Sequence, residues 1–276
     1  MTSLYGIIGD PITHSLSPAM HNAAFTKLKF PGVYLPFRVR PQELDTFLER
    51  LKKLGIRGFN VTIPHKEKIL RYLDKIEPGA SEMGAVNTVI RTRGQWVGFN
   101  TDGAGYLLSL QHEAKFRVRH KRVLLVGAGG ASRGLAHALL KAGVAQLTIA
   151  NRTLTRAEKL VETLRVFFPN RQIDSLSLTK LSQKNVQPDL MINATSLGLD
   201  KNHSSLPVDF LPKGCLVSDL VYRPRITPLL AAAKQRKLAI HEGWGMLLYQ
   251  GVLAFELWTG LKPPVPTMKK ALWTHL

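Results

Sequence analysis

Three closely spaced glycines follow an apolar run near the middle of the chain. Gly127, Gly129 and Gly130 come after VLLV, and apolar residues at helical spacing come after them. Glycine lets backbone N–H groups approach a phosphate closely, and the N-terminus of a following helix attracts the same anion. We therefore predict a strand, a turn and a helix that hold the pyrophosphate of a dinucleotide. Because Ser132 replaces the third glycine of the usual pattern, an ordinary strand-to-helix turn without a ligand is the alternative.

The next apolar run, LTIA, leads into a polar and basic turn. Asn151, Arg152 and Thr153 follow it directly, and Arg156 comes within one helical turn. An NAD site usually has a carboxylate at about this distance from the glycines, which binds the ribose 2′-hydroxyl. Here no carboxylate stands in the turn, and guanidinium groups bind phosphate well. The turn therefore favours NADP(H) over NAD. The alternative, compatible with the first, is that Thr153 or Thr155 caps the next helix.

Polar side chains stand at the ends of apolar runs in the first hundred residues. Ser15 and Ser17 lie where a helix is expected to begin, with Ser17 as its cap, and hydroxyls there can hold a carboxylate. Asn60 and Thr62 alternate along an expected strand, and Lys66 follows where we expect a helix to start. A lysine there opposes the helix dipole, which makes it a functional candidate.

Two further polar patches, GAVNT and GFNTDG, contain Asn87 and Asp102 beside glycines. Each patch taken alone also fits a helix cap, a turn or a solvated surface. Because all the patches lie outside the glycine unit, we predict a polyhydroxylated substrate that makes many hydrogen bonds.

The composition fits a globular protein in a reducing compartment. The chain has 276 residues, 45% of them hydrophobic, and one cysteine, Cys215. No apolar run approaches the ~20 residues that span a bilayer, and no signal-like segment stands at the start. We expect a cytoplasmic protein without a membrane segment, because a lone cysteine forms no internal disulfide. The nine histidines show no metal-ligand spacing, so we expect no metal.

The formal net charge of +19 makes nucleic-acid binding a second possibility. The basic residues are scattered, however, and the densest run, RVRHKR at 117–122, directly precedes the glycine unit. No nucleic-acid-binding motif is present. We expect the charge to attract an anionic cofactor and substrate, and we expect no nucleic acid partner.

The order of apolar runs predicts two α/β domains. Five short strands and several helices are expected in the first hundred residues. From the glycine unit onward VLLV, LTIA, DLMIN, CLVSDL and LAIHE alternate with helical patterns, which is typical of a doubly wound parallel sheet. We predict a substrate-binding domain at 1–102, completed by C-terminal helices within 243–276, and a Rossmann-like NADP domain at 103–242. Ligands are expected between the domains, at the carboxyl ends of strands.

These motifs together resemble those of the shikimate dehydrogenase family. HSLSPAMHN, NVTIPHK, GAVNTV, GFNTDG, GAGGASR, NRT, INATSLG, DLVYRPRITPLL and GMLLYQG occur in the family's order along nearly the whole chain. The resemblance implies NADP-dependent, reversible reduction of 3-dehydroshikimate to shikimate, a step of aromatic amino-acid biosynthesis. Both a monomer and a homodimer remain open.

The resemblance also implies a role for individual residues. Lys66 and Asp102 are the expected catalytic pair. The further residues expected to bind the substrate are Ser15, Ser17, Asn60, Thr62, Asn87, Tyr222 and Gln250. Those expected at the pyrophosphate are Gly127, Ala128, Gly129, Gly130 and Ala131, and those expected at the 2′-phosphate are Asn151, Arg152, Thr153 and Arg156. The expected nicotinamide-side wall is Asn193, Thr195, Leu220, Gly243 and Met246.

Lys66 is the natural hydrogen-bond or proton donor to the substrate oxygen, which gains a proton when the ketone carbon gains a hydride. Desolvation favours an uncharged lysine and Asp102 favours a charged one, so the sequence leaves open which residue relays the proton. Two other functions also stay open. One is a quinate/shikimate dehydrogenase that uses NAD or both cofactors, and the other is a non-catalytic NADP sensor, against which the presence of Lys66 and Asp102 argues.

Overall fold

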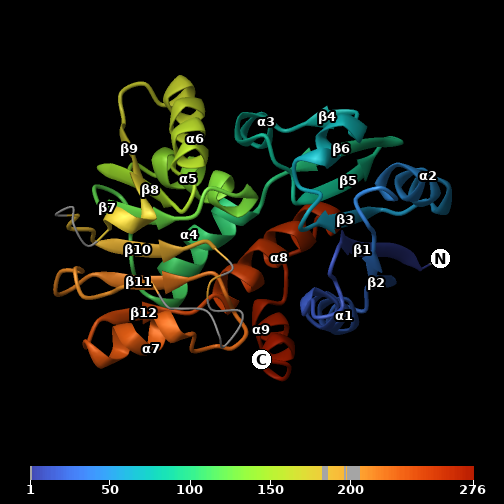
Figure 1. Ribbon diagram of the computed structural model, residues 1–276. Coiled ribbons are helices and arrows are strands. Elements are labelled where there is room, and N and C mark those ends of the chain that lie inside the picture. Colours follow the sequence, from blue (N-terminus) through green and yellow to red (C-terminus); the bar gives the residue numbers. More distant parts are fainter. Residues whose placement is uncertain (1, 182–185, 196, 198–205) are drawn as a thin grey trace. The chain divides into compact units, whose positions relative to one another are not determined.

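A computed structural model describes residues 2–181, 186–195, 197 and 206–276 (Figure 1). The chain divides into two compact units. The first comprises Met1–Gly105 and Leu248–His275, and the second comprises Tyr106–Leu247 with Leu276. The boundaries expected from the sequence, at 102 and 243, lie at the starts of α4 (Asp102–Glu113) and α8 (Trp244–Thr259). Each of these helices begins in one unit and ends in the other.

Within the described residues, the first unit contains a six-stranded mixed sheet in the order β2-β1-β3-β5-β6-β4. β1 is parallel to β2 and β3, while β5 and β6 form an antiparallel hairpin beside β3. The hairpin turns through Arg93 and Gly94, whose positive φ angles of 51° and 81° suit a two-residue turn. The strands are β1 (Ser3–Gly9), β2 (Gly32–Arg38), β3 (Gly58–Val61), β4 (Lys75–Ile76), β5 (Thr88–Thr92) and β6 (Gln95–Phe99).

The helices of this unit are α1 (Ser17–Lys27), α2 (Leu44–Leu54), η1 (Lys68–Tyr72, a 3₁₀ helix), α3 (Pro78–Met83) and α9 (Val265–Trp273), with the second part of α8. α2 buries Leu44, Leu48 and Leu51 in a core that also holds Phe59 and Trp96. It ends at Gly55, whose φ of 68° is the left-handed conformation expected of a helix C-cap.

Two helix starts in the first unit differ from the sequence prediction. Ser17 is the first helical residue of α1 rather than its cap, and Leu16 holds the cap position without a side-chain hydrogen bond. Lys66 does not begin a helix, because only the short η1 follows it. The carbonyl of Lys66 accepts the N–H of Val86 at 2.9 Å, a bond that replaces the one a helix would make to residue 70.

The second unit contains a parallel sheet in the order β12-β11-β10-β7-β8-β9 within the described residues. The strand order reverses direction between β7 and β10, which is the switch point of a doubly wound sheet. The sequence prediction missed β9, an edge strand. The strands are β7 (Arg122–Val126), β8 (Gln146–Asn151), β9 (Gln172–Ser177), β10 (Leu190–Asn193), β11 (Leu216–Asp219) and β12 (Ala239–His241).

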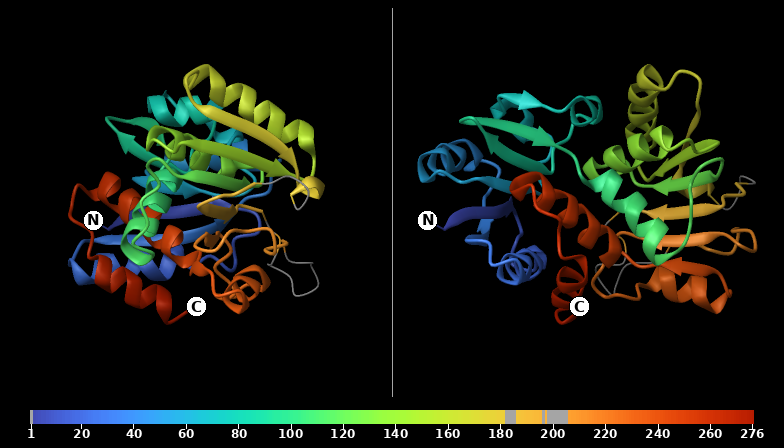
Figure 2. Two further views of the ribbon diagram at one scale, coloured as in Figure 1. Left: turned by 90° about the vertical axis from the view of Figure 1, so that its left-hand side faces the viewer. Right: turned by 180° about the vertical axis from the view of Figure 1, so that it is seen from behind.

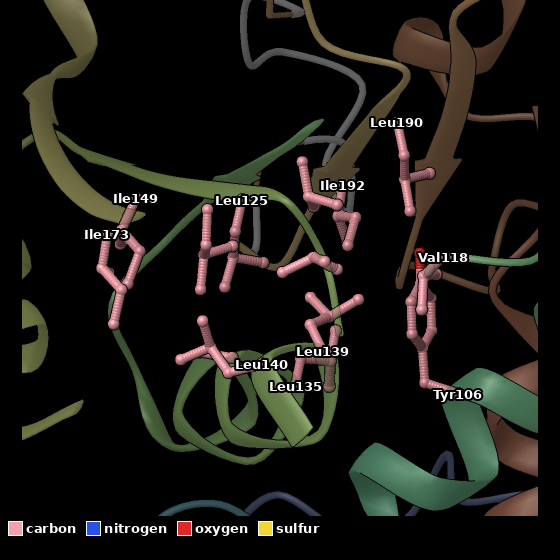
Figure 3. Close-up of a cluster of buried hydrophobic side chains, with 14 of the residues drawn as sticks. Tyr106, Val118, Leu125, Leu135, Leu139, Leu140, Ile149, Ile173, Leu190 and Ile192 are labelled. Carbon is pink, nitrogen blue, oxygen red and sulfur yellow. The ribbon is translucent and has the colours of Figure 1, made fainter. Parts of the chain in front are cut away.

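Helices cover both faces of this sheet. α5 (Gly130–Lys141), α6 (Leu154–Phe167) and part of α4 pack on one face, and α7 (Pro228–Gln235) packs on the other. A one-turn 3₁₀ helix, η2 (Leu178–Lys180), follows β9. Figures 1 and 2 show α6 beside β9 and α7 beside β12, at opposite ends of the sheet. Figure 3 shows the layer in which the sheet faces α5, with Leu125, Ile149 and Ile192 against Leu135, Leu139 and Leu140.

No helix in the described part of the chain is long and apolar enough to cross a membrane.

Candidate active site

The first unit places the predicted catalytic pair in direct contact. Lys66 Nζ lies 2.6 Å from Asp102 Oδ2, and the two side chains are 16% and 5% exposed. Lys66 follows β3 in a turn, and Asp102 is the first residue of α4, where a carboxylate is favoured by the helix dipole. The pair is therefore a largely buried ion pair in which the lysine keeps some exposure, as a group that must reach a substrate oxygen needs.

Asn87 holds the other oxygen of Asp102. Its Nδ2 donates to Asp102 Oδ1 at 2.7 Å. The amide cannot be turned around, because its Oδ1 accepts the backbone N–H of Thr101 at 2.8 Å and a backbone N–H only donates. Asp102 thus accepts from Lys66 on one oxygen and from Asn87 on the other, which fixes its plane.

Two threonines complete this network, and the sequence reasoning gave neither a role. Thr88 Oγ1 donates to Asn87 Oδ1 at 2.9 Å and receives the Asn60 amide at 3.0 Å. Thr101 Oγ1 lies 3.0 Å from Asn87 Nδ2. Both threonines stand next to a predicted site residue in the quoted motifs, and this adjacency is the signal that could have identified them.

The remaining predicted substrate residues of the first unit differ in their contacts. Asn60 belongs to the network and is 4% exposed. Gln250 is brought near by helix packing, since its backbone lies against Gly105, one helical turn after Asp102. Thr62 packs its methyl group against Gly9 in β1. Ser15 Oγ accepts the Ser17 N–H at 3.4 Å, in the turn before α1.

Tyr222 belongs to the second unit and lies in the loop between β11 and α7. Burial raises the pKa of its phenol, with an opposing contribution from Arg223, so the hydroxyl keeps its proton at neutral pH. The structure therefore makes Tyr222 a neutral hydrogen-bond donor, and its predicted role as a substrate contact stays a prediction.

In the second unit, the predicted cofactor residues follow the carboxyl ends of successive parallel strands. Gly127 follows β7, Asn151 ends β8, Asn193 ends β10 and Leu220 follows β11. Because parallel strands present these ends at the same edge, residues up to 93 positions apart in sequence meet there. This edge includes the switch point between β7 and β10, where an open α/β sheet binds its ligand.

The glycine turn combines a backbone that needs glycine with open space beside the start of α5. Gly127 has a φ of 117°, and a Cβ on it would lie 3.0 Å from the carbonyl oxygen of Ala194. Gly129 is the N-cap of α5, and a Cβ there would meet no atom within 4 Å, so the space above the helix N-terminus is open. The free N–H groups of a helix start bind anions.

Ser132, the departure from the usual glycine pattern, does not block this space. It is fully buried, with its Oγ 3.1 Å from the position that a Cβ of Gly127 would take. The serine is therefore buried beside Gly127, and none of its atoms lies within 4 Å of the position that a Cβ of Gly129 would take.

The basic turn after β8 keeps its guanidinium groups available. Asn151 Nδ2 donates to the carbonyl of Thr153 at 2.9 Å, which closes the turn. Arg152 and Arg156 are exposed, and neither forms an ion pair with a residue that the structure describes. Of the two expected caps, Thr155 is wrong because it already lies inside α6, and Thr153 occupies the N-cap position but makes no side-chain capping bond.

The predicted nicotinamide-side residues differ in burial. Asn193 is buried, and its Oδ1 receives the Thr195 hydroxyl at 2.6 Å, which shapes the loop after β10. Gly243 passes so close to Leu220 that a Cβ would lie 2.5 Å from the Leu220 carbonyl oxygen. Met246 is 9% exposed and packs in the core of the second unit. Thr195 and Leu220 are partly buried.

Asp219 supports this wall and was missed by the sequence reasoning. It is fully buried, and it accepts the Asn193 amide at 3.0 Å, the Val221 N–H at 3.0 Å and the Thr227 hydroxyl at 2.7 Å. Burial raises its pKa, and these hydrogen bonds oppose the rise. Its place in the quoted motif DLVYRPRITPLL was the available signal, since a carboxylate ending an apolar strand needs partners.

No cluster of metal-ligating side chains is found among the described residues. Cys215 is buried and unpaired, and burial raises the pKa of its thiol to about 12. Neither feature offers chemistry that competes with the Lys66–Asp102 pair.

Comparison with known proteins gives matches along almost the whole chain. The family model of the shikimate dehydrogenase substrate-binding domain matches residues 7–89. That of shikimate/quinate 5-dehydrogenase matches residues 110–199, and that of the shikimate 5′-dehydrogenase C-terminal domain matches residues 243–272.

Curated and solved relatives agree with these models. The shikimate dehydrogenase (NADP(+)) of Bacillus anthracis is 43% identical over 272 residues, which cover 98% of this chain and 97% of the relative. The solved shikimate 5-dehydrogenase of Thermus thermophilus, in complex with NADP(H) and shikimate, is 38% identical with a TM-score of 0.89 and full coverage of both chains. The quinate dehydrogenase of Corynebacterium glutamicum, in complex with NAD, is 30% identical with a TM-score of 0.91 and covers 99% of each chain. The chain belongs to the shikimate dehydrogenase family.

Proposed function

We propose that this protein catalyses the reversible, NADP-dependent reduction of 3-dehydroshikimate to shikimate in aromatic amino-acid biosynthesis. The observation that carries the proposal is the Lys66–Asp102 ion pair, 2.6 Å long and held by Asn87, in a chain with this family membership. We propose that it acts in the cytoplasm, as a monomer or a homodimer, in agreement with its single, buried cysteine.

Two features of the second unit support NADP(H) as the cofactor. The open space at Gly129 suits the pyrophosphate, and the exposed Arg152 and Arg156 suit a 2′-phosphate. Asn151 and Thr153 would shape that phosphate site, while Ala128, Gly130 and Ala131 would complete the pyrophosphate cradle. NADP(H), when bound, supplies or takes up the hydride. Asn193, Thr195 and Leu220, with Gly243 and Met246, would form the wall on its nicotinamide side.

In the first unit, the residues present donors and acceptors to a carboxylic acid that carries hydroxyl groups. Ser15 and Ser17 would bind the carboxylate, and the hydroxyls would meet Asn60, Thr62, Asn87, Gln250 and, from the second unit, Tyr222. Lys66 donates a hydrogen bond or proton to the ketone oxygen as charge develops there. Asp102 orients the ammonium and balances its charge.

The second candidate is a dehydrogenase that prefers quinate, NAD or both. The likeness to the NAD-bound quinate dehydrogenase motivates it. The basic turn argues against it, because two exposed guanidinium groups and no carboxylate at the end of β8 favour the phosphorylated cofactor.

A steady-state assay separates the candidates. Formation of NADPH, followed by its absorbance, should be fast with shikimate and NADP⁺, and much slower with NAD⁺ or with quinate. A clear preference for NAD⁺ would contradict the cofactor assignment. Failure to oxidise shikimate with either cofactor would overturn the proposed function itself.

A further inference from the structure

The motif HSLSPAMHN ends in His21 and Asn22, two residues that the proposed function does not use. Both lie in α1, against the edge strand β2. Asn22 Oδ1 accepts the backbone N–H of Tyr34 at 2.8 Å, and Asn22 Nδ2 donates to the Tyr34 carbonyl at 3.0 Å. At the outer edge of the sheet, the side-chain amide thus takes the place of a neighbouring strand. Both backbone polar groups of Tyr34, the N–H and the carbonyl, are therefore held by Asn22.

His21 holds the ring of the same tyrosine. The two rings stack with their centroids 4.4 Å apart and 21° between their planes, and both residues are fully buried. Burial lowers the pKa of His21 to about 3, so the imidazole is neutral in the working range. Neither of its ring nitrogens has a hydrogen-bond partner among the described residues. His21 therefore acts on Tyr34 through packing rather than through a polar contact.

The hydroxyl of Tyr34 contacts a residue that we assign to substrate binding. It donates to Asn60 Oδ1 at 2.7 Å, and the side chain of Ser17 lies near enough to lower its pKa against the larger effect of burial. Burial raises the pKa of the phenol well above its ordinary value, so the group keeps its proton and remains a donor. Tyr34 therefore lies beside two residues that we assign to substrate binding.

Asn60 has one hydrogen-bonding position that no described residue occupies. Its Nδ2 donates both hydrogens, to the carbonyl of Asn87 at 3.1 Å and to Thr88 Oγ1 at 3.0 Å. A backbone carbonyl only accepts, so the amide orientation is settled. Its Oδ1 has two acceptor sites, of which Tyr34 uses one. What Asn60 offers a ligand is a single hydrogen-bond acceptor.

We propose that Tyr34, held by His21 and Asn22, is a positioning residue: its hydroxyl occupies one acceptor site of Asn60 Oδ1 and holds the other toward one substrate hydroxyl. This inference rests on the proposed function, since it names how one predicted substrate contact is set. Its consequence is a rule of specificity. At this point of the site the ligand must present a donor, so a hydroxyl is accepted and a carbonyl or a fluorine is not.

The test compares Tyr34→Phe with Tyr5→Phe. Tyr5 is a second buried tyrosine of the same unit, in β1, and its ring packs on Phe25 and Trp258. Tyr34→Phe should raise KM for shikimate about three- to tenfold, as expected for one hydrogen bond, with kcat and KM for NADP⁺ within about twofold of the parent. Tyr5→Phe should leave both KM values unchanged.

A purely structural role for Tyr34 predicts a different result. In that case both variants lower the melting temperature and neither moves KM for shikimate alone. An unchanged KM in Tyr34→Phe, or equal rises for shikimate and NADP⁺, would overturn the proposal. If Tyr34→Phe does not fold, Asn22→Ala should shift the same KM in the same direction, and an unchanged KM there would count against the proposal. Absence of shikimate turnover in the parent protein instead signals that the proposed function is wrong.

Analogues test the acceptor role directly. Deoxyfluoro-shikimates keep the size of a ring hydroxyl but lose its hydrogen, and their binding is measured as competitive inhibition against shikimate. At one ring position, the parent protein should bind shikimate about tenfold more tightly than the analogue, and Tyr34→Phe should discriminate less between the two. Equal discrimination by both proteins at every hydroxyl would refute the assignment of Asn60.

Discussion

Lys66 and Asp102 are 36 positions apart in the chain, and their charged atoms lie 2.6 Å apart in the fold. The sequence marked Lys66 for a reason that the structure does not support, because no α-helix begins there. What makes the lysine a functional candidate is its partner, a carboxylate that is 5% exposed and that accepts a second hydrogen bond from Asn87. A buried ion pair costs desolvation energy, and further hydrogen bonds such as this one help to offset that cost.

The first prediction concerns Lys66. Lys66→Ala should lower kcat by about 10²–10⁴-fold, because it removes the donor to the substrate oxygen, while shikimate binding is largely retained. The measurement is kcat from NADPH formation, together with a dissociation constant for shikimate. Ser15→Ala is the matched control, since it should mainly raise KM. A near-normal kcat in Lys66→Ala would show that the lysine is not catalytic.

At the scale of the element, two glycines of the turn after β7 differ in the reason for which glycine is needed. Gly127 is needed by the backbone, with its φ of 117° and its close approach to Ala194. Gly129 has a φ of −95° and open space at its Cβ position, so the protein itself does not require a glycine there. We therefore predict that a glycine is needed at this position only for ligand binding.

The second prediction follows from this contrast. Gly129→Ala should destabilise the protein by no more than about 1 kcal/mol, because alanine is a poorer N-cap than glycine but would meet open space, yet it should raise KM for NADP⁺ at least tenfold. Gly127→Ala should instead destabilise the protein by about 1–3 kcal/mol, through a strained backbone. Melting curves and KM are measured on both variants. An unchanged KM for NADP⁺ in Gly129→Ala would contradict the assignment of the pyrophosphate to this turn.

At the scale of the whole molecule, each unit contains a buried histidine that resists protonation. Burial lowers the pKa of His21, in the first unit, to about 3 and that of His241, in the second, to about 4, from 6.5. His241 bonds with Ser218 at 2.9 Å and with Ser109 at 2.7 Å, so its imidazole has partners while that of His21 is held by stacking.

The third prediction is a loss of stability in acid. In the unfolded chain these histidines take up a proton near pH 6.5, and in the fold they do so only below about 4 or 3, so the unfolded state binds more protons as the pH falls. Each histidine should therefore cost about 1.4 kcal/mol per pH unit between 6.5 and its folded value. Melting temperatures measured from pH 7.5 to 4.5 should fall across this window.

His21→Leu tests how much of the acid destabilisation comes from the first unit. The variant places an apolar side chain of similar size, which cannot take up a proton, among Tyr34, Phe255 and Trp258. Its melting temperature should fall less steeply below pH 6.5 than that of the parent, whatever its stability at neutral pH. Replacement of the exposed His14 is the control. Identical slopes in His21→Leu and the parent would contradict the assignment.

The elements that the sequence predicted well are those with strong periodic patterns. The sequence of α2 has apolar residues at helical spacing and a glycine at its C-terminal end. The strand VLLV is apolar throughout because a parallel sheet buries it on both faces. β9 was missed because its sequence, QIDSLS, buries only Ile173 and Leu176, as is common for an edge strand. The expected helix does not begin at Lys66, because the N–H of Val86, 20 residues later in the sequence, hydrogen-bonds with the Lys66 carbonyl.

The sequence by itself determined the two α/β halves, the glycine turn and the basic turn that favours a phosphorylated cofactor, because these depend on residue types at short spacing. The catalytic pair, 36 positions apart, was expected only from the family resemblance. Tertiary structure alone decided which oxygen of Asp102 meets Lys66 and which meets Asn87, and that Tyr34 and Asp219 support residues on other strands. The reason is physical. A hydrogen bond between strands depends on the register of the sheet, which long-range packing sets and no local pattern encodes.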